Sequence, residues 1–251
     1  MFDFLILCAA AFGAGVLNTI AGGGTFLTFP ALVAVGVPPV AANATSAVAV
    51  FPGYLAGAVG FRAELAAFDR ARIARLSVIA LAGAAVGSGL LLVSSNKAFS
   101  AVVPFLLLAS TLAFLYGDKI RAIAAARARA VTPEGAMGLF AVSVYGGYFN
   151  GGLGIVLLAL FALWGMSDIH QMNGLKNGLS FVISLISVGI FAAAGLVIWP
   201  YAAAMMVAAT LGGYAGAPLA RRLPKPAVRA LVGLIGFGMS GVFFWRLVSG
   251  S

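Results

Sequence analysis

The sequence predicts an all-α polytopic membrane protein, and three observations lead to this prediction. Hydrophobic residues make up 63% of the 251 residues, charged residues make up 8%, and the mean hydropathy is +1.11. Long apolar runs with few charges are typical of transmembrane helices. The basic residues, which give a net charge of +9, lie mostly in short stretches between these runs. The positive-inside rule explains that distribution, so we expect a lipid bilayer and no nucleic acid as the partner.

The first apolar segment runs from about Phe4 to Val35 and is interrupted by three consecutive glycines at 22–24. It is too long for one span of roughly 20 residues and too short for two full spans. Hydrocarbon does not tolerate unpaired backbone groups, so a helix breaks at membrane depth only where protein or a water-filled cavity satisfies them. We therefore expect two short helices that form a hairpin or a broken pair, with a substrate site beside the break.

Uninterrupted apolar helices are expected further along both halves of the chain. They cover residues 41–60, 76–93, 98–116, 173–193, 196–219 and 227–248. With the two broken segments, this makes about eight long apolar segments. Basic residues among alanines at 117–133 predict an interfacial helix and linker. The expected organisation is a first repeat at 1–116, a linker at 117–133 and a second repeat at 134–251, together one transmembrane domain.

The second half repeats the glycine break of the first half. Asn18 and Gly22 have the same spacing as Asn150 and Gly154, at an offset of 132 residues. Three further sets correspond at a similar offset: Gly15 with Gly147, Asn43 with Asn173, and the glycine pair at 83 and 87 with the pair at 212 and 216. Small-xxx-small spacing alone commonly marks helix packing. The whole run of matching positions indicates a duplicated unit.

The charged loops indicate that the two repeats have inverted topology. The basic loop at 61–75 precedes the glycine-paired helix of the first half, whereas the basic loop at 220–229 follows its counterpart in the second half. Corresponding loops then lie on opposite sides, which requires an odd number of crossings per half. We favour five crossings per half and ten overall, and a re-entrant first segment would give three. Loops 61–75, 117–133 and 220–229 then face the cytoplasm of a bacterium, with the protein in its inner membrane.

The candidate substrate-binding residues lie at the two breaks and near the starts of the following helices. Asn18 and Asn150 occupy equivalent points and would face one another near the membrane midplane. Glycine N–H groups at the positive ends of half-helices would favour an anion. Alternatively, the asparagines only hold broken helix ends in place. The full set is Asn18, Thr19, Gly22, Gly23, Gly24, Thr25, Asn43, Ser46, Asn150, Gly151, Gly152, Gly154, Asn173, Lys176 and Asn177.

Two ionisable residues near one predicted helix start could serve transport. Lys176 lies in an otherwise apolar segment, where an ionisable residue is by default a functional hypothesis. It would supply positive charge to an anion, or it would snorkel to the cytoplasmic headgroups. His170, beside Asp168, could couple transport to protons, a role that histidine side chains commonly serve. The alternative is an ordinary polar residue in a loop.

Other chemistry finds little support in the sequence. There is one cysteine, and the P-loop, GxSxG and HExxH motifs are absent. We therefore expect no catalytic residues, no metal, no cofactor and no enzymatic activity. Acidic residues fall in or beside the predicted loops, which argues against a cation site of paired carboxylates and is compatible with an anion as cargo.

Four segments together resemble the TauE/SafE family of membrane permeases, the sulfite exporter family. They are NTIAGGGTFLTFPAL at 18–32, VPPVAANATSAVAVFPG at 37–53, DIHQMNGLKNGLS at 168–180 and GLVIWPYA at 195–202. The resemblance covers nearly the whole chain and implies transport of small sulfur-containing anions such as sulfite or organosulfonates. Ser46 stands where the second half has Lys176, so a site shared by both repeats would be charged on one side only.

The expected function is secondary transport of such an anion, as an exporter working by alternating access, with a coupled proton or sodium ion as an open question. A carboxylate would also fit the expected donors. The alternatives are therefore a transporter or channel for another small anion, and a membrane scaffold that transports nothing. The sequence does not determine the oligomeric state.

Overall fold

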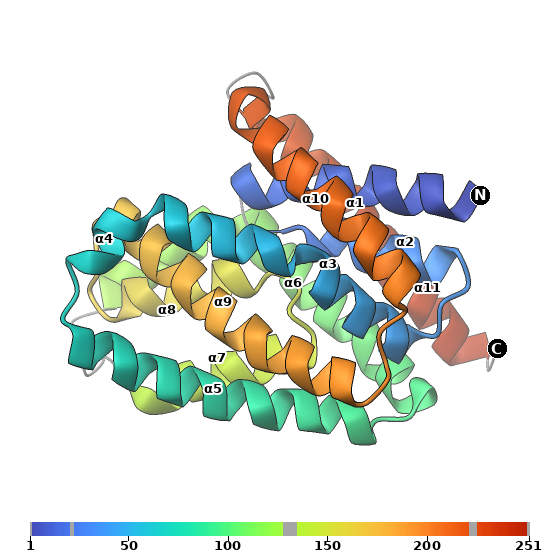
Figure 1. The fold of residues 1–251 in the computed structure, drawn as a ribbon, viewed down its shortest axis with the longest axis horizontal. Helices are drawn as coiled ribbons and strands as arrows, with labels where there is room; N and C mark the ends of the chain where they lie inside the picture. The colour runs from blue at the N-terminus through green and yellow to red at the C-terminus, as the bar shows by residue number, and fades with distance from the viewer. Residues whose placement is uncertain (1, 21–22, 128–134, 221–224, 250–251) are drawn as a thin grey trace.

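The computed structural model describes residues 2–20, 23–127, 135–220 and 225–249. Their secondary structure consists of α-helices joined by short turns (Figure 1). The helices of the first half are α1 Phe2–Ile20, α2 Thr25–Ala34, α3 Pro39–Gly60, α4 Arg62–Ala66, α5 Arg70–Val93 and α6 Asn96–Arg127. Those of the second half are α7 Ala136–Tyr148, α8 Leu153–Leu163, α9 Ile169–Ala193, α10 Trp199–Ala220 and α11 Lys225–Ser249. The prediction of an all-helical fold is confirmed.

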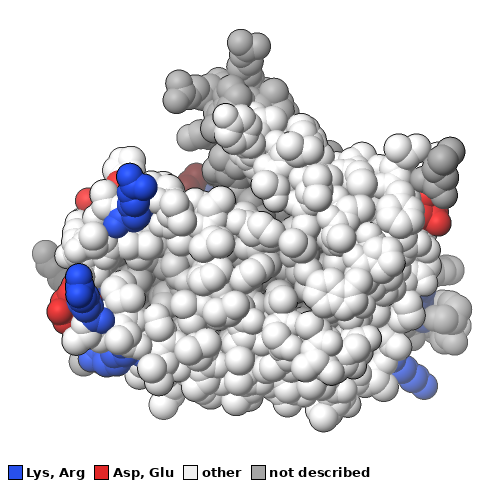
Figure 2. Space-filling model, in the orientation of Figure 1, with Lys and Arg blue, Asp and Glu red and all other residues white. Residues whose placement is uncertain are grey.

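Helix length and charge distribution fit a protein that crosses a membrane. Within the described ranges, four helices are long and apolar enough to span one: α5, α6, α9 and residues Val232–Ser249 of α11. Shorter apolar helices are Phe2–Asn18, α2, α7 and α8. On the face in Figure 2, charged side chains gather at the two ends of the long axis and leave the broad middle uncharged. Such a band matches the hydrocarbon core of a bilayer.

Both broken segments form two separate helices, as the glycines predict. The first break separates α1 from α2, and the second separates α7 from α8. Each second arm ends in the same way, with a glycine at positive φ, at Gly36 and Gly165. The following N–H groups, of Val37 and Met166, bond back to Leu32 O and Phe161 O at 3.0 and 3.1 Å. This left-handed cap suits glycine and turns the chain sharply into the next helix.

Three helices are longer than predicted. α5 begins at Arg70 because the side chain of Asp69 accepts a hydrogen bond from Arg72 N at 3.2 Å. α9 begins at Ile169 after a similar cap, so Lys176 lies about two turns inside the helix. Residues 117–127, expected to belong to an interfacial linker, continue α6, and residues 128–134 lie outside the described part. An acidic N-cap explains the first two extensions, since it satisfies free N–H groups of the first turn.

The N-cap of α9 gives a measurable stability prediction. The Asp168 carboxylate accepts from His170 N at 2.8 Å and from Gln171 N at 3.3 Å. Asp168→Ala removes both acceptors and should lower the free energy of unfolding by about 1 kcal/mol. Asp168→Asn retains a good cap and should stay close to the wild type. Thermal unfolding of the purified protein in detergent measures both. Equal losses in the two variants would contradict the capping role.

Helices from opposite halves pack in corresponding pairs. α1 lies along α10 and α7 lies along α5, while α3 packs on α9 and α6 packs on α11. Glycines bring the backbones of the first two pairs together: a Cβ at Gly15 would overlap Ala209 O, and one at Gly147 would overlap Ala84 O. Small residues allow such close approach between membrane helices.

The glycine contacts correct one sequence correspondence. A Cβ at Gly212 would overlap Phe12 O, and one at Gly87 would overlap Val144 O. Phe12 and Val144 are 132 residues apart, which is the same offset as that of Asn18 and Asn150. In the packed structure, Gly87 is therefore the counterpart of Gly212. The expected match of Gly83 with Gly212 is wrong by one helical turn, because glycine spacing repeats along α5 and does not define its register against α7.

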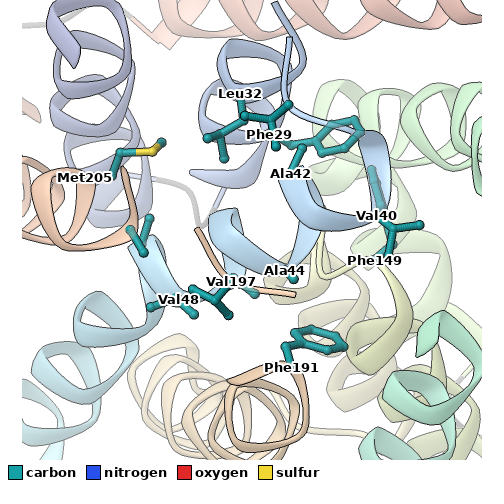
Figure 3. Packing of buried hydrophobic residues seen from close by; sticks show 14 of the residues in the cluster. Phe29, Leu32, Val40, Ala42, Ala44, Val48, Phe149, Phe191, Val197 and Met205 are labelled. Atoms are coloured by element: carbon teal, nitrogen blue, oxygen red, sulfur yellow. The ribbon is translucent and has the colours of Figure 1, made fainter. Parts of the chain in front are cut away.

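Two large apolar clusters and a smaller one, formed by Leu17, Phe26, Phe114, Ile155 and Val232, fill the interior of the described structure. The larger one joins α2 and α3 to α1, α6, α10 and α11, and Figure 3 shows part of it. Phe29 of α2 contacts Phe149, which precedes the second break, with ring centroids 5.7 Å apart. The other large cluster joins α5, α7, α8 and α9. Phe149 thus anchors the break of the second half in the larger cluster, which both halves share.

Candidate functional site

The first break is closed by its own polar side chains. Asn18 at the end of α1 accepts a hydrogen bond from Gly24 N at 2.8 Å. Thr28 and Ser46 join α2 to α3 through hydroxyls 2.6 Å apart. The Gly24 N–H and Ser46, both predicted to contact substrate, therefore have protein partners here. Thr25 and Gly23 are buried beside them, whereas Gly22 and the side chain of Thr19 lie outside the described part.

The second break is held by side chains of α7 and α3. Asn150 has a left-handed backbone, with φ +61°, and Gly152 follows at φ +71°. The Tyr145 hydroxyl of α7 donates to the carbonyl of Gly151. Asn43 of α3 donates from Nδ2 to Tyr148 O at 2.9 Å. Asn43, a predicted substrate ligand, therefore holds the C-terminal end of α7.

The two breaks meet α3 at adjacent residues. The Tyr54 hydroxyl donates to Asn150 Oδ1 at 3.4 Å. A Cβ at the neighbouring Gly53 would lie 3.8 Å from Asn18 Nδ2. One turn further along, a Cβ at Gly57 would lie 2.8 Å from Asn177. Three predicted asparagines from α1, the second break and α9 thus lie beside a single stretch of α3, residues 53–57.

A polar stripe runs along the face of α9 that includes this contact. It consists of Lys176, Ser180, Ser184 and Ser187, which recur at helical spacing and are all buried. Asn150 Nδ2 donates to Ser184 Oγ at 3.5 Å, and Ser187 accepts from Ser88 of α5 at 2.9 Å. The stripe therefore connects the second break to the interior of the second half.

Lys176 is buried inside the molecule. Its side chain is 8% exposed and forms no salt bridge or hydrogen bond with another described residue. Its sequence neighbours Met172, Leu175 and Leu179 on α9 belong to the apolar cluster that joins α5, α7, α8 and α9. A lysine that snorkels to headgroups would expose its ammonium group. The burial argues for the alternative, a charge that faces the protein interior.

His170 and Asn173 lie apart from the two breaks. His170 is exposed in the first turn of α9, and Asn173 is partly exposed one turn later. Ser184, which contacts Asn150, follows His170 by 14 residues, or roughly 21 Å along a helix. Lys176 is about 12 Å from Ser184 along the same axis. The structure thus places Asn18 and Asn150 beside adjacent residues of α3, places Asn177 and Lys176 about two turns from Ser184 along α9, and leaves His170 near the start of that helix.

Sequence analysis missed four polar residues at this location: Tyr54, Tyr145, Ser180 and Ser184. The serines had a detectable signal, since 176, 180, 184 and 187 follow a helical period. The tyrosines had none, because a tyrosine in an apolar helix also fits a lipid-facing position. Gly151, Gly152 and Gly154 are buried at the start of α8, as predicted. No group of three His, Cys, Asp or Glu residues that could hold a metal occurs among the described residues.

These features define a multi-pass helical membrane protein with two interrupted helices whose breaks both lie beside α3. Comparison of the sequence with protein families gives the next step. Residues 7–243 match the sequence model of the sulfite exporter TauE/SafE family, so the chain belongs to that family.

Several curated relatives align over nearly the whole chain. A "Probable membrane transporter protein" of Haemophilus influenzae is 28% identical over 236 residues, covering 94% of this chain and 92% of that protein. "Probable membrane transporter protein YfcA" of Escherichia coli K12 is 27% identical, with 94% and 87% covered. "Probable membrane transporter protein ORF9" of Sinorhizobium sp is 24% identical, with 93% and 89% covered. No solved structure matches the chain significantly.

Proposed function

We propose that this protein is a secondary transporter that exports small sulfur-containing anions, such as sulfite or organosulfonates, across a bacterial inner membrane. Family membership and the names of the relatives support transport. The uncharged band between charged ends supports a membrane location. The basic loops at 61–75, 117–133 and 220–229 are assigned to the cytoplasm by the positive-inside rule.

The buried Lys176 is the observation on which the anionic substrate depends. An ammonium group in a water-poor interior is costly unless a partner compensates its charge. No described carboxylate pairs with Lys176, so the compensating charge is assigned to the substrate. A sulfite or sulfonate group offers several oxygens to a charged donor, and charge-assisted hydrogen bonds are the strong ones.

The helix pairing supports an inverted repeat with three crossings per half. α1 on α10 and α7 on α5 are the same pair with the halves exchanged. The arms α2, α7 and α8 contain 10, 13 and 11 residues, or roughly 15 to 20 Å each, whereas the hydrocarbon core is about 30 Å thick. α1, with 19 residues or roughly 28 Å, nearly reaches that thickness, and the three short arms favour re-entrant hairpins over the ten crossings first expected. Alternating access would arise as one repeat rocks against the other around α3 and α9.

A transport competition experiment tests the substrate class. Purified protein in liposomes preloaded with sulfite should take up radiolabelled sulfite by exchange. Sulfoacetate in excess should suppress the uptake, and malonate, which has a carboxylate in place of the sulfonate, should suppress it at least tenfold less effectively. Liposomes that are preloaded with sulfite but contain no protein are the control for leakage. Equal suppression by both compounds would indicate a general anion transporter, and absence of sulfite exchange would overturn the sulfur-anion proposal.

A further inference from the structure

Ser180 carries a buried hydroxyl with no partner. Its side chain is 0% exposed, and its Oγ has no hydrogen bond. Among the described residues, it is the one serine or threonine with a fully buried and unsatisfied hydroxyl. Buried polar groups are nearly always satisfied in folded proteins, so each exception requires a specific explanation.

A simple local acceptor exists for Ser180 and is not used. A serine in a helix can donate to the carbonyl four residues earlier, which here belongs to Lys176. Other described hydroxyls make this bond: Thr28 to Gly24, Ser110 to Leu106, Thr111 to Leu107, Ser143 to Leu139 and Ser187 to Ile183. The Ser180 hydroxyl departs from this pattern, so it remains available to another acceptor.

Ser180 and Lys176 form a pair of unused donors. They are four residues apart on α9, so their side chains lie on the same face, about 6 Å apart at Cβ. Ser180 is 0% exposed with a fully enclosed Oγ, Lys176 is 8% exposed, and no hydrogen bond joins either side chain to a described residue. A positive charge beside a hydroxyl donor matches a small oxyanion with two or more oxygens on one atom. A neutral or cationic ligand would leave the ammonium uncompensated.

The equivalent positions in the first half do not form a second such pair. Ser46 replaces Lys176 and is already bonded to Thr28, and Val50 replaces Ser180 in the core. The pair of donors therefore occurs once per chain, in the second half.

We propose that Ser180 is a substrate-binding residue that, together with Lys176, forms a single oxyanion subsite on α9. Ser180 donates to one oxygen of the anion while the Lys176 ammonium binds another. Asn150, which bonds Ser184 one turn further along α9, closes the end of this subsite toward the second break. The inference rests on the proposed function only for the sulfur-containing identity of the anion. The two donors by themselves indicate an oxyanion of any kind.

Ligand-dependent thermal stability tests the subsite. The full chain in detergent is titrated with sulfite and, separately, with malonate, as wild type, Ser180→Ala and Ser143→Ala. Ser143 is the matched control, because it is equally buried but donates to Leu139 O at 2.7 Å. Ser180→Ala should raise the sulfite concentration at half-maximal stabilisation about 10- to 100-fold, as expected for a lost hydrogen bond to a charged group. Ser143→Ala should leave that concentration unchanged.

The ligand-free proteins provide a second readout. Ser180→Ala should melt at the same temperature as the wild type or higher, since it removes an unsatisfied buried group, whereas Ser143→Ala loses a bond. A lower melting temperature for ligand-free Ser180→Ala, or an unchanged response to the anion, would overturn the subsite. If Ser180→Ala does not fold, Ser180→Cys keeps the volume with a weaker donor and should also weaken anion binding.

The two proposals fail in different ways. Sulfite binding that is equal in wild type and Ser180→Ala overturns the subsite and leaves the proposed function intact. A response to malonate alone, weakened by Ser180→Ala, supports the subsite and overturns the sulfur-anion identity. A wild-type protein that responds to neither anion overturns both.

Discussion

Gly87→Ala is expected to destabilise the protein by about 3 kcal/mol or more. A Cβ at Gly87 would overlap the carbonyl oxygen of Val144 and lie 2.9 Å from Tyr148 N. These are backbone atoms of α7, so relief requires α5 and α7 to separate along their whole contact. Overpacking typically costs 1 to 3 kcal/mol, and contact with backbone puts this site at or above the upper end. Thermal unfolding and the yield of monodisperse protein in detergent measure the effect.

Gly89→Ala on the same helix is the matched control. A Cβ at Gly89 would meet nothing within 4 Å. Both substitutions gain up to about 1 kcal/mol of helix propensity, so the difference between them isolates the contact with α7. Gly89→Ala should be neutral or stabilising. Similar stability of the two variants would show that α5 and α7 are not packed as described.

The same substitution in the other half examines the proposed repeat. Gly212 approaches Phe12 O as Gly87 approaches Val144 O. If the α1–α10 and α5–α7 pairs are equivalent, Gly212→Ala should destabilise the protein by a similar amount. A mild effect at one position and a severe effect at the other would argue against equivalence.

Lys176→Met is expected to reduce anion transport by about 100-fold or more without destabilising the protein. Methionine fills similar space but removes the charge that would bind the substrate, and a strong charge-assisted bond of about 3 kcal/mol corresponds to a factor near 100. Removal of an uncompensated buried charge should keep or raise the melting temperature. Exchange of radiolabelled sulfite in liposomes and thermal unfolding measure the two effects.

Lys97→Met is the matched control for charge removal. Lys97 is exposed at the start of α6, so its replacement should leave transport unchanged. Lys176→Arg should retain partial transport, because it keeps the charge but changes the shape of the donor. Full transport by Lys176→Met would show that the lysine does not bind the substrate, whatever the anion is.

Several features of this protein could be predicted from local sequence. Apolar composition predicted the helices, and the glycines predicted both breaks, since glycine disfavours the helix interior. The duplicated asparagines predicted that Asn18 and Asn150 face one another near the membrane midplane; the structure shows that both lie beside residues 53–54 of α3. These properties depend on residues close together in the chain or on direct repetition of a motif.

Whether each predicted substrate-binding side chain already has a hydrogen-bond partner in the protein depends on segments that are distant in the chain. Asn43 and Ser46 were predicted to bind substrate, as Lys176 was. In the structure, Asn43 bonds Tyr148, 105 residues away, and Ser46 bonds Thr28. Tyr54 reaches Asn150 across 96 residues. No local sequence pattern specifies such pairings. A polar side chain in a helix has the same neighbouring residues in sequence whether or not another segment supplies its hydrogen-bond partner.

The sequence by itself therefore determined an all-helical membrane protein with two glycine breaks. Only the tertiary structure decided which polar groups are free to bind a ligand. It placed Lys176 inside the molecule and left Ser180 without a partner, while it occupied most of the other donors at the breaks. The physical reason is that helix formation in an apolar medium is governed by local backbone bonding. The satisfaction of buried side chains is governed by packing between segments far apart in the chain.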